Sequence, residues 1–173
     1  MKNFTTCICI MGLSGVAAAD VVMDQIGPDD GTGIGVNITG CQDFEAAYDI
    51  YDINTMDNFT SSGEVINMVE MVLNGWNGFV DPSSVIGYTS NLHSAPSVAA
   101  LDLIGDIASS YADAADATIS ATWLGAGFNV MMPADMAAAS GDNWVSMVPS
   151  NDFATGGQTG TADALVGDGV LGW

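Results

Sequence analysis

The chain has 173 residues, of which 21 are Asp or Glu and one is Lys or Arg, so its formal net charge is −20. A field of that sign has nothing to neutralise phosphate, which excludes nucleic acid and anionic membrane surfaces as partners. The length, with 49% hydrophobic residues, is enough for one ordinary domain with a buried core.

Residues 1–19 are typical of a secretory signal peptide. Lys2 precedes an apolar run from Phe4 to Val16, which is short for a membrane span, and an A-x-A-like cleavage site follows it. We expect cleavage after Ala19 and a secreted, extracellular or cell-surface protein whose residues 20–173 form one domain. An uncleaved anchor or a buried first helix is the alternative. Because Lys2 is the only Lys or Arg, the carboxylates must be stabilised by backbone N–H groups, hydroxyls, water or bound cations.

Beyond the signal, Cys41 is the only cysteine, so no intrachain disulfide can form. We expect a buried, inert thiol. Pairing between molecules is one alternative. Catalysis is another, and it would need His93, the one histidine, as the base.

The first half of the domain is predicted to consist of short strands and loops. An edge strand is expected over residues 20–26, a Gly- and Asp-rich loop over 27–35 and a strand over 36–39. Residues 47–60 alternate apolar side chains with Asp and Asn, which is typical of a sheet with one solvated face.

The longest apolar-rich run after the signal is EVINMVEMVLNGW, residues 64–76. As a strand it would place four apolar side chains on one face: Val65, Val69, Met71 and Leu73. As a helix it would begin with a capping box from Ser61 and Glu64 and end at Gly75. We prefer the strand, because turn-forming Gly, Asn, Asp, Ser and Thr residues surround the run.

Segments with β-like composition continue through the second half, at residues 85–93, 105–111, 118–123, 127–132 and 143–148. A turn is expected over 77–84, a short helical turn within 95–103, and a hairpin turn at Gly125-Ala126. Residues 133–141 should form a turn of helix or an extended connection, Pro149 should end its strand, and the tail should be loop with one closing strand. About nine to eleven short strands predict an all-β fold, a jelly-roll-like antiparallel β-sandwich.

Four segments carry a recognisable set of motifs: residues 57–79 (DNFTSSGEVINMVEMVLNGWNGF), 85–100, 103–111 and 141–160. Together they resemble a group of bacterial secreted proteins with a β-sandwich exodomain, often followed by a PEP-CTERM or dockerin-like anchoring tail. The resemblance implies an exported, surface-associated jelly-roll-like sandwich with no characterised activity and no catalytic residues to transfer. No such tail follows here, so we expect a released protein or a truncated sequence.

These observations favour a non-catalytic, highly acidic surface or matrix domain that binds glycan or divalent cations. Three aromatic residues are candidates for stacking on sugar rings, with core packing as the alternative: Trp76, Tyr88 and Trp123. Five aspartates in expected loops are candidate Ca²⁺ ligands, although none has EF-hand spacing: Asp29, Asp30, Asp106, Asp142 and Asp152. Asp29 and Asp30 could instead cap a turn.

The expected partners are extracellular polysaccharide or further copies of the chain. The alternative function is therefore a sheath or filament subunit in which divalent cations bridge the copies. An enzyme is not expected. The only glutamates are Glu45, Glu64 and Glu70, and Glu64 and Glu70 on one strand would lie roughly 20 Å apart, too far for a glycoside hydrolase pair. An Asp could replace one carboxylate of a glycoside hydrolase pair. For serine hydrolases and zinc enzymes, the sequence has neither a G-x-S-x-G elbow nor a zinc ligand set.

Overall fold

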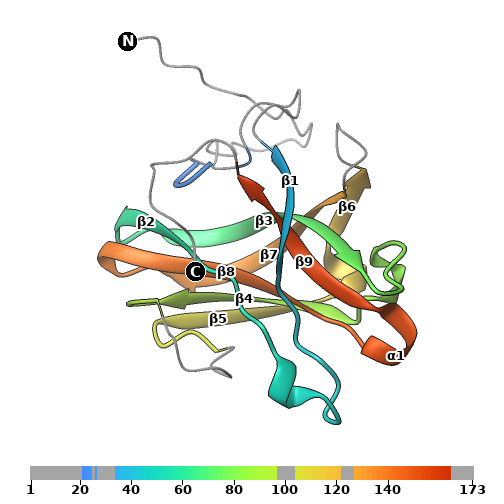
Figure 1. Ribbon diagram of the computed structural model, residues 1–173. Coiled ribbons are helices and arrows are strands. Elements are labelled where there is room, and N and C mark those ends of the chain that lie inside the picture. Colours follow the sequence, from blue (N-terminus) through green and yellow to red (C-terminus); the bar gives the residue numbers. More distant parts are fainter. Residues whose placement is uncertain (1–20, 25, 27–33, 97–103, 122–126, 165–173) are drawn as a thin grey trace.

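The computed structural model describes residues 21–24, 26, 34–96, 104–121 and 127–164 (Figure 1). The expected signal peptide, residues 27–33 of the loop expected over 27–35, most of the helical turn over 95–103 and the hairpin turn at Gly125-Ala126 lie outside these ranges. Residues 34 and 35 of that loop belong to a strand instead. Within them the chain forms nine strands: β1 Ile34–Gly40, β2 Asp57–Ser62, β3 Val65–Trp76, β4 Gly87–His93, β5 Ala108–Asp113, β6 Thr118–Ala121, β7 Phe128–Ala137, β8 Ser140–Ser150 and β9 Gln158–Ala164. Four short helices connect them: η1 Asp49–Tyr51, η2 Pro82–Ser84, η3 Ala114–Asp116 and α1 Phe153–Gly156.

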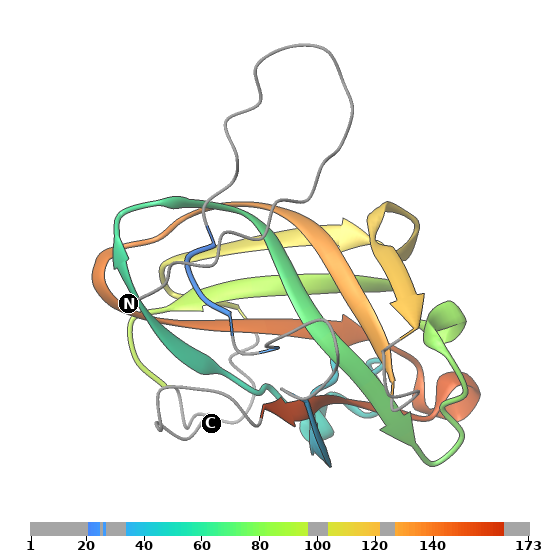
Figure 2. The same ribbon diagram turned by 90° about the horizontal axis from the view of Figure 1, so that it is seen from above.

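The strands form two antiparallel sheets that pack against each other (Figures 1 and 2). The order is β1-β9-β3-β7-β6 in the five-stranded sheet and β2-β8-β4-β5 in the four-stranded sheet. The pairings are nested along the chain: β1 with β9, β2 with β8, β3 with β7 and β4 with β5. Nested pairs that alternate between two sheets are the jelly-roll arrangement, and β6 extends it beside β7. The predicted all-β sandwich is confirmed.

The core lies between the sheets and draws on both. Leu73 and Met132 from the five-stranded sheet pack with Tyr88 and Met147 from the four-stranded sheet. A second cluster is made of Phe59, Leu92, Met136 and Ala138. Full burial of one such side chain stabilises the fold by about 1.5–3 kcal/mol, so the sheets are held together by apolar packing.

Strand β3 confirms the strand interpretation of residues 64–76, with one change. Met71 and Leu73 face the core as predicted, but Val65 is 59% exposed and Ile66 packs against the core instead. The register between β3 and β7 shifts between Ile66 and Met68. Such an irregularity breaks the strict alternation of faces, so the predicted orientation of Val65 is wrong.

Two expected strand regions differ from the structure, although residues 57–60 of the second one do form part of β2. Residues 21–24 are irregular, although Val22 and Met23 still pack against the second core cluster. Residues 47–56 form a turn-rich loop that contains η1. There the Asp52 carboxylate accepts a hydrogen bond from the Phe44 N–H at 2.9 Å. Asp and Asn side chains favour turns through such bonds, which explains why an alternating pattern did not give a strand.

Two prolines expected to lie at or beyond strand ends lie within strands. Strand β7 continues through Pro133, which pairs with Met68 at the register shift where a missing N–H is tolerated. Strand β8 continues through Pro149 to Ser150. The pairing of β8 with β2 ends at Val145, so Pro149 removes no bond from that pair.

Gln42 holds the β1–β2 loop against the end of the chain. Its side chain is 1% exposed. Its Nε2 donates to the Asn151 carbonyl at 2.6 Å, and its Oε1 accepts from the Thr159 N–H at 2.6 Å. One buried amide therefore satisfies backbone groups from two segments more than 100 residues away in sequence.

Within the described ranges, no helix has the length and apolar character needed to cross a bilayer.

Candidate functional site

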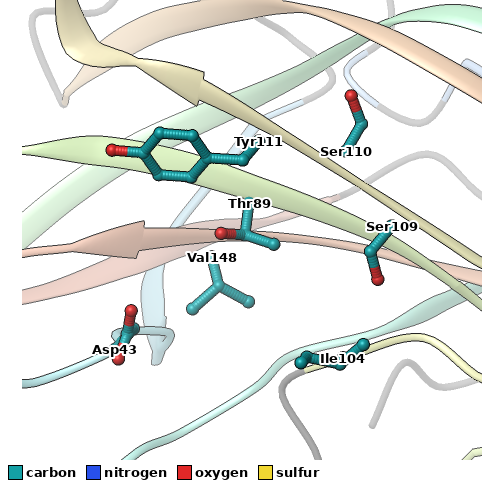
Figure 3. A pocket seen from close by; sticks show the side chains of 7 residues that line it. All are labelled: Asp43, Thr89, Ile104, Ser109, Ser110, Tyr111 and Val148. Carbon is teal, nitrogen blue, oxygen red and sulfur yellow. The ribbon is translucent and has the colours of Figure 1, made fainter.

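The outer face of the four-stranded sheet carries a row of side chains across three strands. Tyr88 and Ala112 point into the core, so alternation directs Thr89 and Tyr111 outward. Thr89 pairs with Tyr111 of β5 on one side and with Val148 of β8 on the other. Figure 3 shows Thr89 between these two side chains.

A cavity of about 500 Å³ lies over this row. Its lining comes from the sheet, from the β1–β2 loop and from the connection between β4 and β5: Asp43, Thr89, Ile104, Ser109, Ser110, Tyr111 and Val148. In Figure 3, Asp43 lies on one side of the row, and Ser109 and Ile104 lie on the other. The site thus combines an aromatic ring, aliphatic surface, hydroxyl groups and a carboxylate.

Tyr111 lies over a glycine of the neighbouring strand and remains 55% exposed. A Cβ added at Gly87 would lie 2.6 Å from Cζ and 2.7 Å from Cε2 of the tyrosine ring. Any larger residue at position 87 would therefore displace the ring. The Tyr111 hydroxyl donates to Oδ1 of Asp113 at 3.1 Å. The ring is held against the backbone of β4 and presents its other side to solvent.

The electrostatic environment of this ring is negative. Partial burial, then the hydrogen bond to Asp113 and the charges of Asp113 and Asp43, raise the pKa of Tyr111 above its usual value. Asp43 is fixed by Ser150, whose Oγ donates to its Oδ2 at 2.7 Å. The described residues include no Lys or Arg, because Lys2 is the only one in the chain.

A buried amide fixes the adjoining edge of the cavity. Asn91 is fully buried, and its Oδ1 accepts from Ser109 Oγ at 2.7 Å and from the Gly105 N–H at 3.2 Å. Its Nδ2 donates to Ser146 Oγ at 3.3 Å. Gly105 directly follows Ile104, so this network positions one wall of the cavity relative to the sheet.

The structure changes the set of aromatic residues suited to a sugar. Tyr88 is completely buried in the core, and burial raises its pKa to about 12, so its ring is not presented to a surface ligand. Trp76 is half-buried and packs across Gly160 and Gly40 at the end of β3. Trp123 lies outside the described residues. Tyr111 is not among the candidates identified from the sequence. Only the alternation of the strand could have indicated it, because an inward-facing Ala112 places the neighbouring Tyr111 on the outer face.

The structure does not bring the candidate calcium ligands together. Asp29 and Asp30 lie outside the described residues. Asp106 accepts from Ser94 N at 2.8 Å, Asp142 is in β8 and accepts from Thr60 Oγ1 at 3.1 Å, and Asp152 precedes α1. Among the residues that the structure describes, no three His, Cys, Asp or Glu side chains form a group able to hold a metal ion.

The residues considered for catalysis occupy separate positions. His93 is buried, with Nδ1 4.0 Å from Oδ1 of Asp106, and the Ser94 hydroxyl donates to Asp106. Cys41 is 1% exposed and its thiol donates to the Met147 carbonyl at 3.3 Å. Burial raises the Cys41 pKa to about 11, which suits the inert thiol expected from the sequence.

The glutamates serve local hydrogen bonds in different parts of the fold. Glu45 accepts from the Phe153 N–H at 2.8 Å, and Glu64 accepts from the hydroxyl of Ser61 and from the Ser62 N–H. Glu70 lies in the middle of β3.

A second exposed surface lies on the β1–β2 loop and α1. We call it the aromatic patch, formed by Tyr48, Ile50, Tyr51, Ile53 and Phe153. The centroid of the Tyr48 ring lies 6.4 Å from that of Tyr51 and 5.7 Å from that of Phe153. Tyr51 is 58% exposed, close to the exposure of Tyr111, but it lacks the cavity.

No protein-family model matches the chain, and comparisons with curated proteins and with solved structures find no match.

Proposed function

We propose that the protein is a non-catalytic glycan-binding domain, and that a sugar ring stacks on Tyr111 over the outer face of the four-stranded sheet. The observation that supports this most directly is the half-exposed Tyr111 ring held against Gly87 beside a cavity. An aromatic side chain offers a large apolar surface at little cost in conformational entropy, which suits the C–H face of a sugar.

The polar groups around the ring suit the rim of the same sugar. Thr89 carries a hydroxyl that can donate and accept, and Asp43 carries a carboxylate that accepts from sugar hydroxyls. Ser109 Oγ already donates its proton to Asn91 and accepts from the Gly105 N–H, so it can only offer a further acceptor position. A few convergent polar groups on a mostly apolar surface are the usual composition of a small-molecule site. The hydrogen bonds of the buried Asn91 already hold Gly105 and Ser109 in place, so this wall of the cavity loses little conformational entropy when a ligand binds.

The expected export signal and the strongly acidic composition support action outside the cell, at a surface or in a matrix. In such a setting a polysaccharide presents many copies of one ring, so several copies of the domain held on one surface would bind the polymer more tightly than one domain does. Divalent cations would act by screening charge between neighbouring molecules.

The test is affinity gel electrophoresis of the secreted protein through a panel of neutral, amino and acidic polysaccharides, with Ca²⁺ and with EDTA. We expect retention on at least one polymer. Tyr111→Ala should weaken it about five- to tenfold, because loss of one stacked ring costs on the order of 1–1.5 kcal/mol. Tyr111→Trp should preserve retention.

Tyr51→Ala is the matched control, because Tyr51 is an equally exposed tyrosine on the aromatic patch. It should leave retention unchanged. Absence of retention on every polymer would contradict the proposed function. Loss of retention in Tyr51→Ala but not in Tyr111→Ala would move the binding surface to the aromatic patch and contradict the assignment of the site.

A further inference from the structure

Two carboxylates flank the Tyr111 ring. Asp113 lies 3.1 Å from the ring hydroxyl through Oδ1, and Asp43 forms one wall of the cavity. Asp43 uses Oδ2 to accept from Ser150. Each carboxylate thus uses one of its two oxygens. Oδ1 of Asp43 and Oδ2 of Asp113 accept no hydrogen bond from the described part of the chain, so each can accept one from a ligand.

No cationic side chain of the described structure opposes them. Lys2 is the only Lys or Arg of the sequence, and His93 is 3% exposed at the far end of β4. A sugar carrying a carboxylate or sulfate would lose part of its hydration beside Asp43 and Asp113 and gain no opposite charge. A sugar carrying an ammonium group would have a carboxylate to accept its hydrogen bond and would be attracted by the charge of the other.

Resting on the function proposed above, we infer that the ligand of the Tyr111 site is an amino sugar with a free ammonium group, and that the site discriminates against uronic acids and sulfated sugars. The ring stacks on Tyr111 while the ammonium lies in the field of Asp43 and Asp113 and donates to an open carboxylate oxygen. The expected ligand is thus a polymer of unacetylated aminohexose.

The test compares three trisaccharides by isothermal titration calorimetry at about 0.15 M salt, where long-range attraction is largely screened. The probes are a glucosamine trimer, an N-acetylglucosamine trimer and a uronic acid trimer. We expect the glucosamine trimer to bind at least about tenfold more tightly than the acetylated trimer, and the uronic acid trimer not to bind.

Because the whole protein is strongly acidic, the test must separate this site from the general field. Asp43→Asn and Asp113→Asn should each reduce the preference for the glucosamine trimer several-fold, since each removes one charged acceptor. Asp135→Asn removes the same charge from an exposed position on β7 and should leave the preference unchanged.

The outcomes distinguish this inference from the function on which it rests. Equal binding of the glucosamine and acetylated trimers, or tighter binding of the uronic acid trimer, overturns the inference and leaves glycan binding standing. An equal loss in Asp135→Asn also overturns it, because the preference would then belong to the overall charge. Failure of all three trimers to bind, together with no retention in the gels, overturns both.

Discussion

Because Tyr111 packs against Gly87, a substitution at Gly87 should displace the Tyr111 ring without removing it. In Gly87→Ala, the new methyl carbon would lie 2.6–2.7 Å from ring atoms of Tyr111, well inside van der Waals contact. The ring lies at the free end of a half-exposed side chain, so it can swing outward by about 1 Å. We expect Gly87→Ala to shift the stacking surface and to leave the fold intact.

The magnitude follows from two opposed terms. Crowding at a packed contact costs about 1–3 kcal/mol, and a movable ring places this site at the lower end. Replacing a strand glycine by alanine recovers about 0.5–1 kcal/mol of backbone entropy. The net change in the free energy of unfolding should therefore stay within about 1 kcal/mol, whereas glycan affinity should fall several-fold, up to the roughly five- to tenfold loss expected when the ring is removed.

The assay is a double-mutant cycle of Gly87→Ala and Tyr111→Ala, with urea unfolding and polysaccharide retention measured for all four proteins. In the Tyr111→Ala background the methyl group meets no ring, so Gly87→Ala should have no further effect on retention. If Gly87→Ala lowers retention equally in both backgrounds, or leaves it unchanged in the wild type, the packing of Tyr111 on Gly87 is not what positions the ligand.

Three further predictions concern the scaffold. Gln42→Leu should lower the free energy of unfolding by about 2–5 kcal/mol, because it leaves two buried backbone groups without their partner. The same change at Gln158, which is half-buried and accepts one side-chain hydrogen bond from Asn77, should cost only about 0.5–1.5 kcal/mol. A loss in Gln42→Leu no larger than that in Gln158→Leu during urea unfolding would contradict the reasoning. Hydrogen bonds from Ser61 and Ser62 lower the pKa of Glu64 from 4.5 to about 2. The Glu64 carboxylate therefore stabilises the β2–β3 turn fully above pH 4.5, and this stabilisation is lost as the pH falls through about 2. An NMR titration of Glu64 with a midpoint near the ordinary value would refute this, and Glu64→Gln should remove the pH dependence. The Cys41 thiol should resist alkylation in the native protein at about pH 8 and react fully in urea; rapid native labelling would show that it is accessible.

The sequence predicts the layers of this fold better than the details of its surface. The turn-forming residues around residues 64–76 predict a strand rather than a helix, and β3 confirms this prediction. The reversed orientation of Val65 depends on how β3 pairs with β7, which is a property of two segments about 70 residues apart. No periodicity within one segment contains that information.

The same reason explains what was missed at the site. Tyr88 and Tyr111 are both strand tyrosines, and composition does not distinguish the buried one from the exposed one. The distinction comes from which neighbours face the core and from the glycine that lies opposite the ring. Asp43 joins the site only because the β1–β2 loop runs beside Ser150, a contact between residues 107 positions apart.

The position of β9 between β1 and β3 has a consequence for how the protein is made. A ribosome delivers the first and third strands long before the residues that join them, so the five-stranded layer stays open until residues 158–164 have emerged. Folding of this kind is governed by distant pairings and is slow. Until β9 has emerged, the edges of β1 and β3 that it joins have no partner strand between them.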